Sequence, residues 1–131
     1  MNIQIERLYG WDLRSKDYEP GLKNAMAFTP YIWRGSIDGK EACLLGIIPP
    51  TALSVSAYIW LHCHPICDDH KFIVIRYSRM IIEELLKEYS LLVGYCVVGD
   101  DRAIRWMKWL GAQFTEVDGT KVKFVIRNSH G

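Results

Sequence analysis

Five side chains that can transfer protons, act as nucleophiles or ligate metals lie within nine residues: His62, Cys63, His64, Cys67 and His70. An imidazole changes its charge near neutral pH, so His62 and His64 are candidate general bases. The alternative role of these two rings is structural, because histidines at the end of a strand also hydrogen-bond loop backbone. The sequence leaves both interpretations open.

A metal site is the second chemistry that this segment could carry. Structural zinc sites usually join two separated pairs of ligands, whereas these residues form one crowded segment. If a strand continued through them, Cys63 and His64 would point to opposite faces. The spacing therefore predicts no metal. Cys67 is a weak candidate nucleophile, because the neighbouring carboxylates of Asp68 and Asp69 oppose its ionisation.

The composition indicates one ordinary globular domain that spans residues 1–131. Hydrophobic residues make up 50% of the chain and charged residues 24%, which is enough to build a core. A count of 16 Lys and Arg against 15 Asp and Glu gives a net charge of +1, which disfavours a nucleic-acid partner.

The cellular location is inferred from what the chain lacks. The start, MNIQIERLYG, has no cationic segment followed by an apolar one, and no run approaches the roughly 18 apolar residues of a membrane span. We therefore expect a cytoplasmic protein without a membrane partner, whose cysteines stay reduced. Cys43 and Cys96 lie in apolar strands and are predicted to be core residues.

Hydrophobic periodicity and turn residues predict an α+β order of elements. The order is a strand over 2–8, at most two short helical turns within 9–30, strands over 31–37, 40–48 and 55–61, a helix over 71–89, a strand over 91–98, a short helix capped by Asp100 or Asp101 and ending at Gly111, and strands over 112–117 and 121–127. The last residues, 128–131, are expected to be a frayed tail.

Two features of this order are specific. Asp38-Gly39 and Asp118-Gly119 are dipeptides typical of tight hairpin turns, so each is predicted to join two antiparallel strands. The long helix lies between the strands that end at Leu61 and Val98. A right-handed crossover makes those two strands parallel neighbours.

The long helix has an apolar and a charged side. Its predicted apolar side is Val74, Tyr77, Ile81, Leu85 and Tyr89. On the other side, Glu83 and Lys87 have the i, i+4 spacing that favours an ion pair.

The segment Asp100 to Gly111, DDRAIRWMKWLG, resembles the last helix of the GNAT acyltransferases, whose pattern is Asn-x-x-Ala-Ile-Arg-x-Tyr-x-x-Leu-Gly. The predicted order of elements is also the order of the GNAT fold. From Lys71 through the closing hairpin, the chain is similar to the small internal virion proteins of short-tailed phages, which share the Val-Gly-Asx turn and the Ile-Arg-containing helix. This closer likeness covers about half of the chain, and residues 1–54 match only in element order.

The resemblance implies an α+β fold with a central mixed sheet of about six or seven strands and a long helix between two splayed parallel strands. It also implies transfer of an acetyl group from acetyl-CoA to an amine, with His62 or His64 as the base. The acetyl-CoA would lie in the cleft between the strands that end at Leu61 and Val98. Its implied contacts are Leu61, Cys63, His70, Lys71, Arg102 and Arg105.

The chain departs from the family at the loop that holds the pyrophosphate. That loop is Gly-rich, because exposed backbone N–H groups at a helix N-terminus bind anions. Here the segment reads HPICDDHKF and contains no glycine. Asp68 and Asp69 would cap the helix and repel a pyrophosphate. The family's tyrosine, which protonates the leaving thiolate, falls on Met107, which has no proton to give.

The last helix is predicted to have two sides. Its core side is Ala103, Trp106, Met107 and Leu110. Arg102, Arg105 and Trp109 share the opposite side. That side is suited to an adenine and phosphate group, and the alternative is a solvated surface with one partly covered aromatic ring.

Two functions from different classes remain open. The first is an N-acetyltransferase that uses acetyl-CoA. The second is a GNAT scaffold without chemistry that binds a protein, either a host enzyme or a virion component, in the host cytoplasm or in the phage particle. The missing glycine loop, Met107 and the 5 Trp and 7 Tyr residues favour the second, since aromatic residues are frequent at interfaces.

Overall fold

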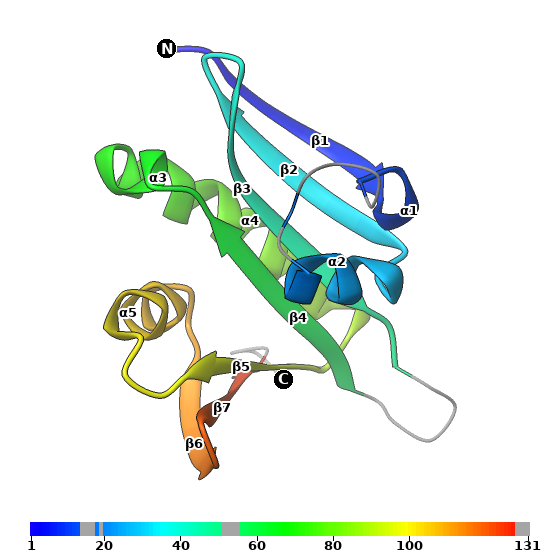
Figure 1. The fold of residues 1–131 in the computed structure, drawn as a ribbon, viewed down its shortest axis with the longest axis vertical. Coiled ribbons are helices and arrows are strands. Elements are labelled where there is room, and N and C mark those ends of the chain that lie inside the picture. The colour runs from blue at the N-terminus through cyan, green and yellow to red at the C-terminus, as the bar shows by residue number, and fades with distance from the viewer. Residues whose placement is uncertain (14–17, 19, 51–55, 128–131) are drawn as a thin grey trace. The chain divides into compact units, whose positions relative to one another are not determined.

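The computed structural model describes residues 1–13, 18, 20–50 and 56–127 (Figure 1). Its strands form a seven-stranded mixed sheet in the order β1-β2-β3-β4-β5-β7-β6. The elements are β1 (Ile3–Tyr9), α1 (Gly10–Leu13), α2 (Pro20–Ala27), β2 (Tyr31–Ile37), β3 (Lys40–Ile48), β4 (Ser56–Cys63), α3 (Ile66–Asp69), α4 (Lys71–Glu88), β5 (Leu91–Val97), α5 (Asp101–Trp109), β6 (Gln113–Asp118) and β7 (Lys121–Arg127). The predicted α+β fold class and the mixed sheet are confirmed.

The chain divides into two compact units. The first contains Met1–Pro49 and Ile59–Lys71, and the second contains Pro50–Tyr58 and Phe72–Gly131. The single domain over 1–131 stays a prediction, as does a cleft between the strands that end at Leu61 and Val98. The predicted tail at 128–131 lies outside the described residues.

The first hairpin is the clearest agreement between the sequence and the first unit. Asp38 and Gly39 have φ angles of +49° and +81°, as a type I′ turn requires at both central positions. The turn pairs Ile37 with Lys40 and Ser36 with Glu41, and a bulge follows between Gly35 and Ser36. Strand β1 pairs in antiparallel orientation with the edge of β2 that faces away from β3.

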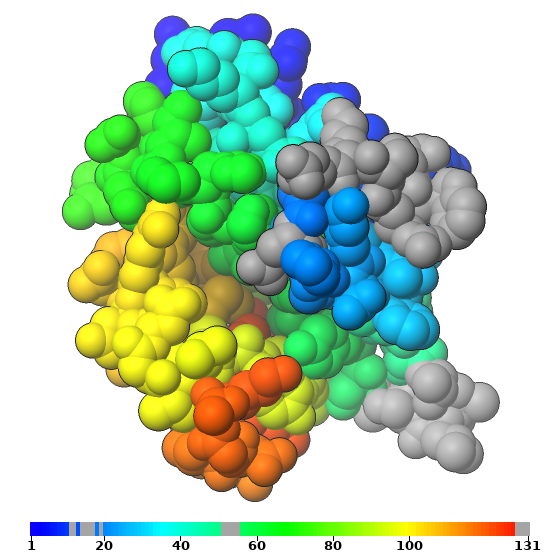
Figure 2. Space-filling view, viewed as in Figure 1, coloured from blue at the N-terminus to red at the C-terminus, as the bar shows by residue number. Residues whose placement is uncertain are grey.

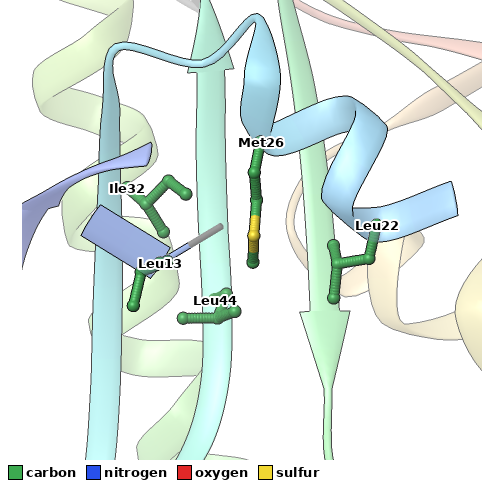
Figure 3. Close-up of a cluster of buried hydrophobic side chains, with 5 residues drawn as sticks. All are labelled: Leu13, Leu22, Met26, Ile32 and Leu44. Carbon is green, nitrogen blue, oxygen red and sulfur yellow. The ribbon is translucent and has the colours of Figure 1, made fainter. Parts of the chain in front are cut away.

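A cluster of apolar side chains joins the two short helices to this hairpin. Its members are Leu13 from α1, Leu22 and Met26 from α2, Ile32 from β2 and Leu44 from β3. Figure 3 shows Met26 pointing from α2 towards Leu44. Within the described residues, α1 (4 residues) and α2 (8 residues) lie between β1 and β2, which is more helix than the two short turns predicted. Pro20 begins α2, because proline fits the first turn of a helix.

In the second unit, the start of β4 pairs with β5. Ser56, Ala57 and Tyr58 lie opposite Leu91, Leu92 and Val93 in parallel orientation. This confirms the predicted parallel neighbours. Strand β7 pairs with β5 along its whole length, and β6 is the last strand of the sheet.

Helix α4 buries a side that overlaps the predicted one, since Val74 and Leu85 are buried as predicted. Its buried residues are Val74, Ser78, Ile82 and Leu85, so Tyr77 and Ile81 lie at the margin of the packed side. Lys87 forms an ion pair with Glu84 at 2.9 Å, three residues away, and the predicted partner Glu83 also interacts electrostatically with Lys87. None of the helices in the described ranges is long and apolar enough to cross a membrane.

Helix α5 begins and ends as its sequence predicts. Asp100 is the N-cap, and its Oδ1 accepts a hydrogen bond from the Ala103 N–H at 3.1 Å. Gly111, with a φ angle of +96°, turns the chain out of the helix, and the Ala112 N–H donates to the Met107 carbonyl at 2.9 Å. In Figure 2, the yellow residues of α5 and the orange residues of the β6–β7 hairpin are visible on the surface.

Candidate functional site

His64, immediately after β4, is held by its backbone and by its side chain. Its N–H donates to the Ala42 carbonyl at 2.8 Å. Its Nε2 lies 2.7 Å from Oε2 of Glu41, and the two side chains are 37% and 19% exposed. An imidazole beside a carboxylate, still reachable from solvent, is a suitable arrangement for accepting a proton.

Tyr18 is the second partner of Glu41. Its hydroxyl donates to Oε1 of Glu41 at 2.7 Å, so both carboxylate oxygens have a partner. Burial, together with the hydrogen bond to Glu41, raises the pKa of Tyr18 to about 12. The phenol therefore stays protonated at neutral pH and acts as a donor to Glu41.

The two predicted bases, His62 and His64, are brought together. Their rings meet edge to face with centroids 4.9 Å apart. His62 belongs to β4, whereas His64 lies one residue beyond the end of β4 and is the ring that contacts the carboxylate. Between the two candidates, this contact favours His64.

Sequence reasoning missed Glu41 and Tyr18. Glu41 looks like an ordinary charged residue next to a hairpin turn, and Tyr18 lies 23 positions away from it. Glu41 joins the site because β3 lies next to β4, so that the residue after Cys63 reaches it. No local pattern in the sequence predicts that pairing.

The segment between β4 and α4 forms a short helix, α3, instead of an open loop. The N–H groups of Cys67, Asp68 and His70 donate to the carbonyls of His64, Pro65 and Cys67 at 3.0, 3.0 and 3.2 Å. These N–H groups are therefore not directed towards an anion. Asp68 and Asp69 are exposed and precede the first turn of α4, where they repel phosphate.

These observations test whether the chain fits the pyrophosphate of acetyl-CoA as the family's loop does. A pyrophosphate needs unpaired N–H groups and positive charge. In the segment 64–70, three N–H groups are bonded to carbonyls of the segment itself, and two adjacent carboxylates bring negative charge. The residues present do not fit the pyrophosphate in the family's manner.

The other residues implied for acetyl-CoA are divided between the two units. Leu61 and Cys63 are partly buried in β4, His70 separates α3 from α4, and Lys71 is exposed at the start of α4. Arg102 and Arg105 belong to α5 in the second unit.

On α5, the predicted arginine and tryptophan side is formed. The Arg105 guanidinium lies 5.8 Å from the Trp109 ring centroid, within the range of a cation-π contact. The Arg79 guanidinium of α4 donates to the Trp109 carbonyl, which belongs to the last residue of α5. Met107 is buried, at 4% exposure, and packs as a core residue.

The four cysteines are free thiols. Cys67 is fully buried and its Sγ donates to the Ala42 carbonyl at 3.0 Å, so it is a packed thiol rather than an exposed nucleophile. A hydrogen bond with Cys67, followed by burial, raises the pKa of Cys43. Within the described ranges, no group of three or more His, Cys, Asp or Glu residues could hold a metal ion.

Comparison with solved structures identifies the architecture. An IAA acetyltransferase from Bacillus cereus superposes with a TM-score of 0.72 at 10% identity, covering 97% of this chain and 100% of that one. The fold is that of the GNAT acetyltransferases.

Two further GNAT-fold structures agree. The ribosomal-protein-S18-alanine N-acetyltransferase from Escherichia coli has a TM-score of 0.67 at 11% identity, covering 96% of this chain and 94% of that one. A putative acetyltransferase from Salmonella typhimurium, solved with its cofactor acetyl-CoA, has a TM-score of 0.63 at 12% identity. The match covers 98% of this chain and 96% of that one. No family model and no curated protein matches the sequence. At these identities the likeness establishes the GNAT fold.

Proposed function

We propose that this GNAT-like, acetyltransferase-related protein transfers an acetyl group from acetyl-CoA to an amine, with His64 as the base. The observation that carries the proposal is the contact between His64 and Glu41 at the end of β4. The side chain is partly exposed and can meet an acceptor, and its Nε2 is held by a carboxylate. His62, in edge contact with His64, is the second candidate.

The chain's own residues would act on the acceptor. His64 removes a proton from the ammonium form of the acceptor, and the freed lone pair of the nitrogen is the nucleophile. When bound, acetyl-CoA would supply an activated acetyl thioester. The new C–N bond replaces the C–S bond, the nitrogen loses its second proton to water, and the leaving thiolate takes a proton from water. Because segment 64–70 does not fit the pyrophosphate, donor binding would depend on other contacts. Cys63, Lys71, Arg102 and Arg105 are the proposed ones.

The test is release of coenzyme A, measured as free thiol, from acetyl-CoA and a panel of amines. The panel contains a polyamine, a lysine peptide and a peptide with a free N-terminus. We expect H64Q to lower the rate about 100-fold, as loss of a general base does, and H62Q to lower it less. Thiol release by the wild-type chain no faster than the uncatalysed rate with every amine would contradict the proposal.

The second candidate function is protein binding without catalysis. It is supported by helix α3, whose structure does not fit a pyrophosphate. With its N–H groups bonded internally and Met107 buried, the GNAT scaffold would act by binding a protein, without chemistry. An aromatic surface in the first unit supports this. Tyr9 (60% exposed) and Phe28 (72% exposed) line a pocket of about 550 Å³ with Tyr31.

Under either function we propose a phage origin, on the strength of the likeness to internal virion proteins from Lys71 onwards. The partner would be a host enzyme in the host cytoplasm or a component of the virion. Mass spectrometry of purified virions and affinity capture of the tagged chain from infected cells separate these cases. Presence in particles supports the virion case, and one specific host enzyme supports the other. Finding neither would count against protein binding.

A further inference from the structure

Glu41 holds two groups at once, and each of its oxygens has one partner. Oε1 accepts from the Tyr18 hydroxyl at 2.7 Å, and Oε2 lies 2.7 Å from Nε2 of His64. The distances are those of strong hydrogen bonds. A carboxylate has only acceptor atoms, so the ring nitrogen that faces it must carry the hydrogen.

We propose that Glu41 is a positioning residue that fixes the tautomer of His64, so that Nε2 carries the proton and Nδ1 supplies the lone pair that accepts a proton from the acceptor amine. Tyr18 acts through Glu41, because its hydroxyl keeps the carboxylate turned towards the histidine. The role of His64 as a base rests on the proposed function. The assignment of its tautomer does not, because it follows from the contact with Glu41. A carboxylate that orients a histidine in this way is a common arrangement at reactive imidazoles.

The backbone supports this assignment. The His64 N–H donates to the carbonyl of Ala42, the residue after Glu41, at 2.8 Å. One stretch of β3 therefore fixes both the main chain and the ring of His64. Turning the ring over about its Cβ–Cγ bond would place the carbon Cε1 where Nε2 meets the carboxylate, so the contact favours the observed orientation.

The state of Tyr18 is consistent with a donor role. Burial and the contact with Glu41 raise its pKa to about 12, so the phenol keeps its hydrogen throughout the neutral range. The hydrogen bond to Oε1 then persists wherever the histidine can act as a base.

The first test is nuclear magnetic resonance of the imidazole nitrogens over a pH series, with the tautomer read from the spectra of the neutral rings. We expect wild-type His64 to show a protonated Nε2 and an unprotonated Nδ1. The variants H64N and H62N assign the signals. A wild-type ring protonated at Nδ1, or one that exchanges evenly between the two tautomers, would overturn the proposal.

The substitution E41Q makes the test sharper because glutamine has nearly the same shape. Its amide oxygen can still accept from Tyr18, and its amide N–H₂ then faces His64 and donates. We expect the ring to change to the form with a protonated Nδ1. A tautomer unchanged in E41Q would also overturn the proposal. The variant E116Q is the matched control, because Glu116 is exposed on β6, and it should leave the His64 signals unchanged.

Enzyme assays separate this proposal from the proposed function. We expect E41Q to lower kcat about 100-fold with little change in KM, and Y18F to lower kcat less than E41Q. If the wild type is inactive but its tautomer is fixed, the proposed function fails and the positioning role stands. If the wild type is active and E41Q retains its kcat, the positioning role fails alone.

Discussion

The indole nitrogen of Trp60 donates a hydrogen bond to the Thr29 hydroxyl at 2.9 Å, and that hydroxyl donates to the Ala25 carbonyl at 2.7 Å. Thr29 is 3% exposed, so the bonds lie largely out of water. They connect β4 to the end of α2.

The substitution T29V should destabilise the protein, because valine has nearly the same shape but leaves the indole N–H without its partner. We expect a loss of about 1 to 3 kcal/mol in the free energy of unfolding, measured by urea denaturation. T115V is the control, since Thr115 is exposed on β6. A loss in T29V no larger than in T115V would show that the bond contributes nothing.

Gly46 lies directly beneath the same indole ring. A Cβ added at Gly46 would lie 2.1 Å from Cε2 of Trp60, so G46A must displace the ring and break its bond to Thr29. We expect a loss of about 2 to 3 kcal/mol by urea denaturation. The control is G35A, where the nearest atom is the Cys43 Sγ at 3.3 Å, so that a far smaller displacement is needed.

The two substitutions should also be less than additive, because both remove the Trp60 bond. The double variant G46A/T29V should lose clearly less stability than the sum of the single variants. Full additivity would indicate that the ring stays in place in G46A.

Alkaline pH should lower stability through Tyr18. Its pKa rises from 10 to about 12 on folding, so the unfolded chain releases the phenol proton first. The contribution is complete below pH 10 and is lost as pH rises towards 12. Allowing for the partial exposure of the phenol, we expect about 1 to 2 kcal/mol.

Urea denaturation of wild type and Y18F across that range measures this contribution. The pKa values of Tyr58 and Cys96 are also raised, so these groups also lower the stability of the fold as the pH rises. Both groups remain in Y18F. The difference between the two curves therefore isolates Tyr18. Parallel curves would contradict the assignment.

Removal of the acidic pair before α4 should strengthen binding of coenzyme A. Asp68 and Asp69 are exposed, and their charges repel the phosphates. By calorimetry we expect the double variant D68N/D69N to bind coenzyme A about 3- to 10-fold more tightly than wild type, with the difference shrinking at high salt. E88Q removes one exposed charge at the far end of α4 and should change nothing. Equal affinities in D68N/D69N and wild type would show that the pair does not face the ligand.

Local signals in the sequence predicted most of the fold. The hairpin strands 31–37 and 40–48 follow from the Asp38-Gly39 turn, and the last helix follows from Asp100 and Gly111. Each of these signals acts through the backbone angles or hydrogen bonds of a few neighbouring residues. The packed side of α4 was predicted less well, because tertiary contacts selected Ser78 over the neighbouring Tyr77.

The candidate site was only half predicted. The histidines were found because an imidazole is chemically distinctive wherever it lies. Glu41 and Tyr18 were not, since their role depends on contacts across 23 positions of sequence. The helix α3 was also missed. A segment rich in His, Cys and Asp is typical of a loop, yet three of its N–H groups donate to carbonyls of the same segment.

The turn at Asp38-Gly39 determines whether His64 has a carboxylate partner, because it sets the register of β3. It pairs Ile37 with Lys40 and Ser36 with Glu41, and thereby decides on which face of the sheet the carboxylate stands. One residue more in the turn would move Glu41 to the opposite face. An insertion in this turn, whether engineered or natural, would therefore remove the carboxylate from His64 without changing any residue of the site.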